Sequence, residues 1–236
     1  MAAKITISLA GHRIEFIEAS GGLIPFFENY RAPDDAEPEF TVKVSYGFVN
    51  GTTIIRGGEQ SRFILTHKAI SDFLIEKQVL TFHASALCYD GKAYLFSAPS
   101  GTGKSTHTRL WRERFGEKVV MISDDQPFIG FDENGRAICY GSPYNGKEKL
   151  GANIEAPIGG ICVCSRGSEN LITRLSSAEA VLRLSPNAYF PKNMELASNA
   201  LAVIKRLAET VPVYDHSFNM EPTAAEYAMR RLVKGE

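Results

Sequence analysis

The stretch that most constrains this fold is "SAPSGTGKST", residues 97–106, because it has the spacing of a phosphate-binding loop. Gly103, Lys104 and Ser105 occupy the last positions of the pattern G-x-x-x-x-G-K-[ST], and Ala98 stands in place of its first glycine. A loop of this type joins a buried strand to a helix, and the flanking runs "KAYLFS" and "KSTHTRLWRERF" supply both. The sequence therefore predicts an α/β fold with a phosphate-binding loop, or P-loop, in its core.

Each residue type in the loop has a physical role. Glycines allow backbone N–H groups to approach phosphate oxygens, and the N-terminus of the following helix adds positive potential. Lys104 would reach the β- and γ-phosphates as a point charge, and Ser105 would ligate Mg²⁺. The alternative is a glycine turn that precedes a helix by chance. The predicted cofactors are ATP and Mg²⁺, and the predicted nucleotide-binding residues are Ser100, Gly101, Thr102, Gly103, Lys104, Ser105 and Thr106.

A histidine is predicted to lie beside the loop. The dipeptide "DG" at 90–91 favours a two-residue hairpin turn between "VLTFHASALCY" and "KAYLFSA", so that Ser85 faces Phe96. Continuing that register sets His83 opposite Ala98. There His83 could ligate a metal, position a phosphate or tune a neighbouring acid. The alternative is a half-buried histidine that only packs on the sheet.

Two adjacent aspartates follow the next apolar run, "VVMI". Such a run is typical of a strand buried on both faces of a parallel sheet, and with the preceding strand and helix it predicts a right-handed βαβ unit. Ligands bind outside the carboxyl ends of such strands, where Asp124 and Asp125 fall. One carboxylate would hold Mg²⁺, and the other would accept the proton of an attacking hydroxyl. Without the preceding loop, the pair would suit an ordinary turn.

A second glycine-rich loop, "GSPYNGKEKLG" at 141–151, is polar and basic at its centre. Lys147 or Lys149 could clamp the transferred phosphoryl group or an anionic substrate, and Glu148 could complete a metal site. A solvated surface loop is the alternative.

The N-terminal region, residues 1–65, is predicted to be β-rich and to contact the substrate or a partner. "KITISLAGHRIEFIE" alternates apolar and polar residues around Gly11, and "EFTVKVSYGFV" does so before an Asn-Gly hairpin at 50–51 and the strand "TTII". "NYRAPDDAEPEF" is predicted to be a solvent loop. "SRFILT" is predicted to be a strand, and Thr66 is predicted to cap the helix "HKAISDFLIEK". Residues 66–236 are predicted to form the P-loop domain, with a mixed sheet.

The rest of the chain continues the α/β pattern. Asn134 and Gly135 predict a hairpin, and "APIGGICVC" and "LITRL" predict further strands. Ser176 and Glu179 form a capping box, and "MELASNALAVIKRLAET" has helical periodicity. "VPVYDH" and "TAAEYAMRRLV" are predicted to close the chain as a strand and a helix.

Composition and charge argue against several classes of partner. The formal net charge of -1 gives no reason to expect binding to nucleic acid or to an anionic membrane. No apolar run approaches the ~20 residues that span a bilayer, and the N-terminus lacks a signal-peptide pattern, so we expect a cytoplasmic location. A homo-oligomer is compatible with these features. The cysteines form no Cys-x-x-Cys pair and are expected to be reduced and mostly buried: Cys88, Cys139, Cys162 and Cys164.

"FHASALCYDGKAYLFSAPSGTGKSTHTRLW" followed by "VVMISDD" resembles the catalytic core shared by HPr serine kinase/phosphorylase and ATP-dependent phosphoenolpyruvate carboxykinase. In that superfamily a histidine precedes the strand of the phosphate loop, and an Asp-Asp pair follows its helix. The resemblance covers roughly residues 83–131 and extends more loosely to the C-terminus. It implies that His83 is an active-site histidine, that Asp124 activates the acceptor hydroxyl, and that Asp125 lies on the metal side.

The chain also departs from both families. It is far shorter than a carboxykinase and has no obvious arginine cluster for oxaloacetate before the loop. It lacks the Glu-x-Arg-Gly-Leu-Gly stretch by which HPr kinases are recognised, and "YGSPYNGKEKLG" stands in its place. These departures indicate a stand-alone relative with an acceptor of its own.

The leading hypothesis is an ATP-dependent kinase that transfers the γ-phosphoryl group to a hydroxyl. The acceptor would be a serine of a protein or peptide, or a small-molecule alcohol, and the catalytic residues would be Asp124, His83 and Lys104. One alternative is a carboxykinase-like enzyme acting on a keto acid. Another is a non-catalytic nucleotide sensor whose N-terminal region binds a partner.

Overall fold

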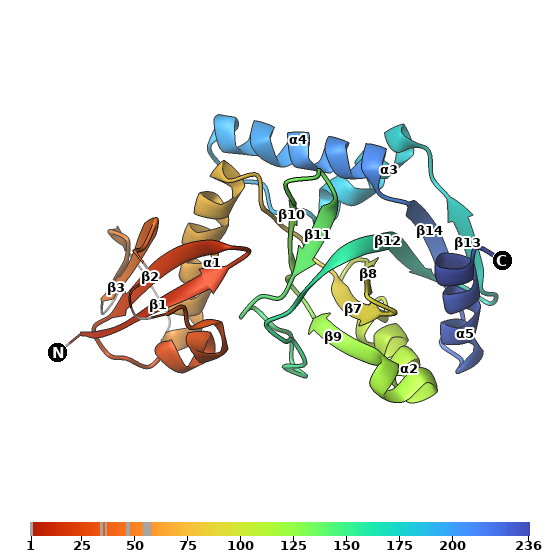
Figure 1. Cartoon of the computed structure of the whole chain (residues 1–236), viewed down its shortest axis with the longest axis horizontal. Coiled ribbons are helices and arrows are strands. Elements are labelled where there is room, and N and C mark those ends of the chain that lie inside the picture. Colours follow the sequence, from red (N-terminus) through yellow and green to blue (C-terminus); the bar gives the residue numbers. More distant parts are fainter. Residues whose placement is uncertain (1, 34, 36, 46–47, 54–57) are drawn as a thin grey trace. The chain divides into compact units, whose positions relative to one another are not determined.

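The computed structural model describes residues 2–33, 35, 37–45, 48–53 and 58–236. It is a mixed α/β protein that divides into two compact units, Met1–Lys77 and Gln78–Glu236 (Figure 1). The division follows helix α1 (Glu59–Glu76), whereas the boundary predicted from the sequence, between residues 65 and 66, falls inside that helix. The difference arises because α1 packs on the strands of the first unit.

The first unit is a five-stranded sheet in the order β1-β2-β3-β4-β5. Its two predicted hairpins are confirmed, since the registers leave two-residue turns at Ala10-Gly11 and at Asn50-Gly51. Ile54 and Ile55 of the predicted strand "TTII" lie outside the described residues. The strands are β1 (Ala3–Leu9), β2 (His12–Glu18), β3 (Phe40–Ser45), β4 (Phe48–Val49) and β5 (Thr52–Thr53).

The connection from β2 to β3 includes residues 29–40, which were predicted to be a solvent loop, and it contains a short helix. The two strands pair in parallel, so the chain must cross from one end of the sheet to the other. The 3-10 helix η1 (Ile24–Tyr30) lies within this crossover, and it buries Phe27 and Tyr30. The sequence did not predict η1, because one short 3-10 helix has too few turns to show a clear periodicity.

The prediction that "SRFILT" forms a strand is wrong, because residues 61–66 lie inside α1. Ile64 is 60% exposed, although strand alternation would give it the same orientation as Thr66, which is buried. The Thr66 hydroxyl donates a hydrogen bond to the carbonyl of Phe63 one turn earlier, so it does not cap the helix. The helix begins instead directly after Gly58.

The second unit has a larger mixed sheet in the order β6-β10-β11-β12-β8-β7-β9. The long strand β12 pairs with β11 along its first residues and with β14 along its last, and β13 pairs with β14. β12 runs parallel to β8 and β14, and the other pairs are antiparallel. The strands are β6 (Leu80–Thr81), β7 (Ser85–Tyr89), β8 (Lys92–Ser97), β9 (Val119–Ser123), β10 (Phe128–Phe131), β11 (Ala137–Tyr140), β12 (Glu155–Arg166), β13 (Leu171–Arg174) and β14 (Val213–Phe218).

Helices of the second unit pack on this sheet in two groups (Figure 1). Helices α2 and α5 contact each other over a core that includes Phe96, Trp111 and Phe218, while α3 and α4 pack together away from them. The predicted capping box of Ser176 and Glu179 is confirmed at α3. The helices are α2 (Lys104–Phe115), η2 (Gly116–Lys118), α3 (Ser177–Leu184), η3 (Ser185–Asn187), α4 (Met194–Thr210), α5 (Thr223–Met229) and the π-helical turn η4 (Arg230–Lys234).

The prediction that "VVMI" is buried on both faces of the sheet is wrong. Strand β7 lies between β8 and β9 and is antiparallel to both, so β8 and β9 run in the same direction without pairing. In the described sheet β9 is an edge strand, and Val120 is 45% exposed instead of buried. The apolar run alone could not distinguish an edge strand with one covered face from a central strand.

The cysteines agree with the sequence analysis. All four are free; three are buried and Cys88 is half-buried. In the part of the chain that the structure describes, no helix is both long and apolar enough to cross a membrane.

Candidate functional site

A cavity of about 460 Å³ lies in the second unit, where β8, β9 and β12 end and α2 begins. It gathers residues that are up to 83 positions apart in the chain, and most of the predicted site residues are among them. Thr102 and Lys149 are predicted site residues that are not part of the described lining. The lining residues are His83, Ser100, Gly101, Gly103, Lys104, Ser105, Thr106, Asp124, Asp125, Gly146, Lys147, Glu148 and Arg166.

Two glycines shape the loop between β8 and α2. Gly101 and Gly103 have φ angles of 81° and 117°, in the region that favours glycine over residues with a side chain. A Cβ atom on Gly103 would also lie 2.8 Å from the sulfur of Met220. Helix α2 begins directly after Gly103, so the N–H groups of its first turn point toward the cavity. The local geometry is that of a loop that can bind an anion.

Lys104 is folded back against the loop. Its side chain is buried, and its Nζ donates a hydrogen bond to the carbonyl of Ala98 at 2.7 Å. Burial lowers the pKa of Lys104, and the nearby Asp125 carboxylate partly opposes that shift. Among the described residues, this desolvated ammonium group donates hydrogen bonds only to carbonyl oxygens, and it is well placed to exchange them for a phosphate oxygen.

Asp124 is held by the second glycine-rich loop. Its carboxylate is buried, and Oδ1 accepts a hydrogen bond from the backbone N–H of Gly146 at 2.7 Å. A Cβ atom on Gly146 would lie 3.2 Å from Oδ2 of the same carboxylate. The absence of a side chain at Gly146 therefore allows the backbone to approach Asp124, and the contact fixes the direction of the carboxylate.

His83 and Asp125 form a pair at the edge of the cavity. Nε2 of His83 lies 3.2 Å from Oδ1 of Asp125. The backbone supports this arrangement, since the N–H of Ala84 donates to the Asp125 carbonyl at 3.0 Å and the Ser97 hydroxyl donates to the His83 carbonyl at 2.8 Å. The predicted hairpin register is confirmed, with Ser85 facing Phe96, and it leads His83 to the loop.

The basic loop contributes two residues to the lining. Lys147 and Glu148 lie at the cavity, and Glu148 accepts from Arg112 of α2 at 3.2 Å. This ion pair connects the second glycine-rich loop to the helix that follows the first one. Glu148 was considered above as a metal ligand, and in this structure its carboxylate has a cation partner instead.

Arg166 is a cavity residue that the sequence analysis did not identify. It is the last residue of β12, and its side chain donates hydrogen bonds to the carbonyls of Thr102 at 2.8 Å and Gly101 at 2.9 Å. The signal available in the sequence was its position two residues after the apolar run "ICVC". A strand that pairs in parallel with β8 must end beside the same loop, but the sequence does not reveal that β12 is this strand.

The oxygen ligands at the cavity suit Mg²⁺. The Ser105 hydroxyl and the Asp125 carboxylate are hard ligands, and Mg²⁺ commonly takes one or two protein ligands and completes its shell with phosphate and water. Among the described residues, no group of three His, Cys, Asp or Glu side chains could form a metal site by itself. The residues present therefore fit an ion that arrives with a phosphate ligand.

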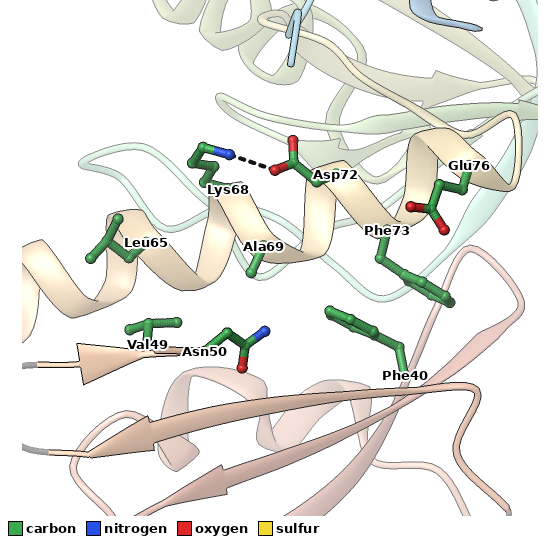
Figure 2. Close-up of a pocket in the computed structure, with 9 residues that line it drawn as sticks. All are labelled: Phe40, Val49, Asn50, Leu65, Lys68, Ala69, Asp72, Phe73 and Glu76. Atoms are coloured by element: carbon green, nitrogen blue, oxygen red, sulfur yellow. Dashed lines mark hydrogen bonds and ion pairs between the residues drawn. The ribbon is translucent and has the colours of Figure 1, made fainter. Parts of the chain in front are cut away.

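A second hollow, of about 300 Å³, lies within the first unit between α1 and the sheet (Figure 2). Phe40 and Phe73 stack in it with ring centroids 4.7 Å apart, and Lys68 pairs with Asp72 at its rim. Its lining is more apolar than polar and contains no glycine-rich loop. The hollow suits an apolar side chain better than a phosphate group.

Comparisons with known proteins find similarity only to solved structures. Neither the scan against protein-family models nor the search of curated proteins finds a match for this sequence. Among solved structures, the chain is similar to the Hpr(Ser) kinase/phosphatase from Coxiella burnetii, with 12% sequence identity and a TM-score of 0.38. The likeness covers 66% of this chain and 94% of that one.

Proposed function

We propose that this chain is an ATP-dependent kinase that transfers the γ-phosphoryl group to a hydroxyl acceptor. The observation that carries the proposal is that one cavity contains both a glycine-rich loop with Lys104 and Ser105 and the carboxylates of Asp124 and Asp125. The first set suits a polyphosphate, and the second suits a metal ion and the proton of an acceptor.

The loop and Lys104 would bind the phosphates. The N–H groups at the start of α2 would donate to phosphate oxygens, and Lys104 would leave the Ala98 carbonyl to contact the β- and γ-phosphates. Ser105 and Asp125 would hold Mg²⁺, which neutralises charge on the β- and γ-phosphates when it is bound. This arrangement supports catalysis chiefly by positioning and by electrostatic stabilisation.

Asp124 would act on the acceptor. The acceptor oxygen forms a bond to the γ-phosphorus while the bond from that phosphorus to the bridging oxygen of ADP breaks, and the hydroxyl proton passes to the Asp124 carboxylate. The products are ADP and a phosphate monoester. Since Oδ1 accepts from the Gly146 N–H, Oδ2 is the oxygen that would receive the proton.

His83 would support the metal side of the site. Its Nε2 lies 3.2 Å from Oδ1 of Asp125, so an N–H at that position would orient the carboxylate and limit its rotation. His83 would then act through Asp125 and not directly on the acceptor.

Lys147 and the first unit are proposed to contact the acceptor. Lys147 lines the cavity and would attract an anionic substrate or the transferred phosphoryl group. Lys149 does not line the cavity in the described structure, so Lys147 is the stronger candidate of the two. The acceptor class stays as predicted from the sequence: a serine of a protein or peptide, or a small-molecule alcohol.

The proposal is tested by incubating the protein with γ-labelled ATP, Mg²⁺ and an extract of peptides and metabolites. We expect the label to appear in a phosphate monoester, and we expect Lys104→Ala, the control for the phosphate loop, to give none. If ATP binds but the label is never transferred, the chain is a nucleotide sensor. If the protein releases CO₂ from oxaloacetate in the presence of ATP, it is carboxykinase-like.

A further inference from the structure

Arg166 differs from most arginines of the second unit in its partners. Arg112 pairs with Glu148, and Arg183 pairs with Asp215. In the described part of the chain Arg166 forms no ion pair, and its guanidinium contacts only the two loop carbonyls. Arg166 thus lies at the rim of an anion-binding cavity with uncharged carbonyl groups as its hydrogen-bond partners. Both carbonyls belong to the phosphate loop, which indicates that Arg166 acts on that loop.

The geometry of the two contacts has a consequence for the loop. The described chain has no cis peptide bonds, so each carbonyl and the N–H of the following residue point in opposite directions. Arg166 binds the carbonyls of Gly101 and Thr102, and the N–H groups of Thr102 and Gly103 must therefore point away from its guanidinium. The two hydrogen bonds determine the orientation of both peptide planes.

One of these N–H groups is used inside the loop. The N–H of Thr102 donates to the carbonyl of Pro99 at 3.3 Å. None of the hydrogen bonds among the described residues uses the N–H of Gly103, and Gly103 lines the cavity. This donor is therefore oriented and available for an anion.

Lys104 contacts the same loop from its other end, and together the two cations bind four of its carbonyls. Lys104 donates to Ala98 at 2.7 Å and lies 3.5 Å from the carbonyl of Pro99. Carbonyl oxygens that faced the cavity would repel a phosphate, so cationic partners for them favour the conformation that binds anions. Lys104 can exchange its carbonyl partners for a phosphate oxygen. Arg166 lies on the side of the loop to which the carbonyls of Gly101 and Thr102 point, so it can keep those contacts when a phosphate binds.

We infer that Arg166 is a positioning residue that orients the backbone of the phosphate loop through the Gly101 and Thr102 carbonyls, so that the Gly103 N–H faces a bound polyphosphate. The inference rests on the proposed function, since it concerns the same site. With a polyphosphate bound, Arg166 would still contact the loop carbonyls, and it would contact neither the nucleoside nor the terminal phosphate.

The test compares the binding of inorganic tripolyphosphate, ADP and ATP to wild type and to Arg166→Ala by titration calorimetry. We expect all three affinities to fall by a similar factor of about tenfold, which is the effect of misaligning one hydrogen bond to a charged group. Arg166→Lys keeps the charge but not the planar pair of donors, so we expect it to lose most of the same affinity. Arg183→Ala removes an exposed cation that does not line the cavity, and it serves as the matched control with wild-type affinities.

Each other pattern overturns the inference. Loss restricted to ADP and ATP would mean that Arg166 contacts the nucleoside, and loss restricted to ATP and tripolyphosphate would mean that it contacts the terminal phosphate. Full rescue by Arg166→Lys would mean that only its charge matters, and unchanged binding in Arg166→Ala would mean that it has no role. If wild type binds none of the three ligands, the proposed function itself fails. An unchanged thermal unfolding midpoint in each variant shows that the fold is intact.

Discussion

At the scale of single residues, Gly146 controls the direction of the Asp124 carboxylate. An added Cβ would lie 3.2 Å from Oδ2 and 3.4 Å from the carboxyl carbon, so Gly146→Ala must displace Asp124 by a few tenths of an ångström. We expect this shift to lower kcat by about tenfold, since small misplacements of catalytic groups are costly. ATP affinity should be unchanged, because Gly146 does not belong to the phosphate loop.

The measurement is steady-state phosphoryl transfer alongside equilibrium ATP binding for wild type and Gly146→Ala. Gly160→Ala is a suitable comparison, since its Cβ would lie 3.4 Å from the Tyr214 ring, an ordinary contact distance, and would not meet Asp124. Equal effects of Gly146→Ala on ATP affinity and on kcat would contradict a role specific to the acceptor side.

The two loop glycines offer a matched pair of variants. Gly101→Ala adds only backbone strain, because nothing lies within 4 Å of the added Cβ, and such strain costs of order 1–3 kcal/mol. Gly103→Ala adds similar strain and also a clash with Met220 at 2.8 Å. We therefore expect Gly103→Ala to lower the urea midpoint of unfolding further than Gly101→Ala does. The double variant Gly103→Ala with Met220→Ala should recover part of the difference, and no recovery would show that the clash is unimportant.

Residue identities at the site were largely accessible from the sequence, because they belong to short motifs. The loop spacing pointed to Lys104 and Ser105, and hairpin register led to His83. Arg166 was not accessible, because its role depends on which strand pairs with β8, and that pairing joins residues more than 60 positions apart. The ion pair of Glu148 with Arg112 was missed because it joins residues 36 positions apart, whose proximity depends on the tertiary fold.

At the scale of elements, α2 meets β14 through a buried pair of histidines. The His107 and His216 ring centroids are 4.8 Å apart, and both side chains are fully buried. Trp111 donates to His107 at 3.2 Å, whereas both ring nitrogens of His216 lack a hydrogen-bond partner among the described residues. Burial lowers the pKa of His216 from 6.5 to about 4, and burial and then His216 lower the pKa of His107 well below its ordinary value.

These shifts predict acid sensitivity of the second unit. The unfolded chain binds protons below about pH 6.5 that the folded state binds only near pH 4 or lower, so the free energy of unfolding falls as pH decreases through this window. The shift at His216 alone contributes about 3 kcal/mol to the free energy of unfolding at neutral pH, and this contribution is lost once the pH falls below the folded-state pKa. Urea unfolding between pH 7 and pH 4 should show a steeper loss of stability for wild type than for His216→Leu. Equal slopes would mean that His216 is not the group responsible.

Elements defined by local signals were predicted well, and elements defined by long-range pairing were not. The "DG" turn and the Ser176 capping box depend on a few neighbouring residues, and both are confirmed. The place of β7 between β8 and β9 depends on tertiary contacts. "SRFILT" was misassigned because a short apolar run fits a strand and a helix equally well until the exposure of Ile64 is known.

At the scale of the whole molecule, the candidate site lies entirely in the second unit. Every residue that lines the cavity falls within Gln78–Glu236, which has its own sheet and core. We therefore expect a fragment of residues 78–236 to fold and to bind ATP with the affinity of the full chain. Circular dichroism and calorimetry check this, and a folded fragment without ATP binding would contradict it. If the first unit contacts the acceptor, as proposed, the fragment should also lose phosphoryl transfer.

The central claim is that nucleotide binding and acceptor activation belong to different residues of one cavity. Its most direct test is to measure ATP affinity and single-turnover phosphoryl transfer together in wild type, Lys104→Ala and Asp124→Asn. We predict that Lys104→Ala loses ATP binding, while Asp124→Asn binds ATP as wild type does and transfers the phosphoryl group at least about 100-fold more slowly, as expected for loss of a general base. Wild-type transfer by Asp124→Asn, or wild-type ATP binding by Lys104→Ala, would contradict the proposal.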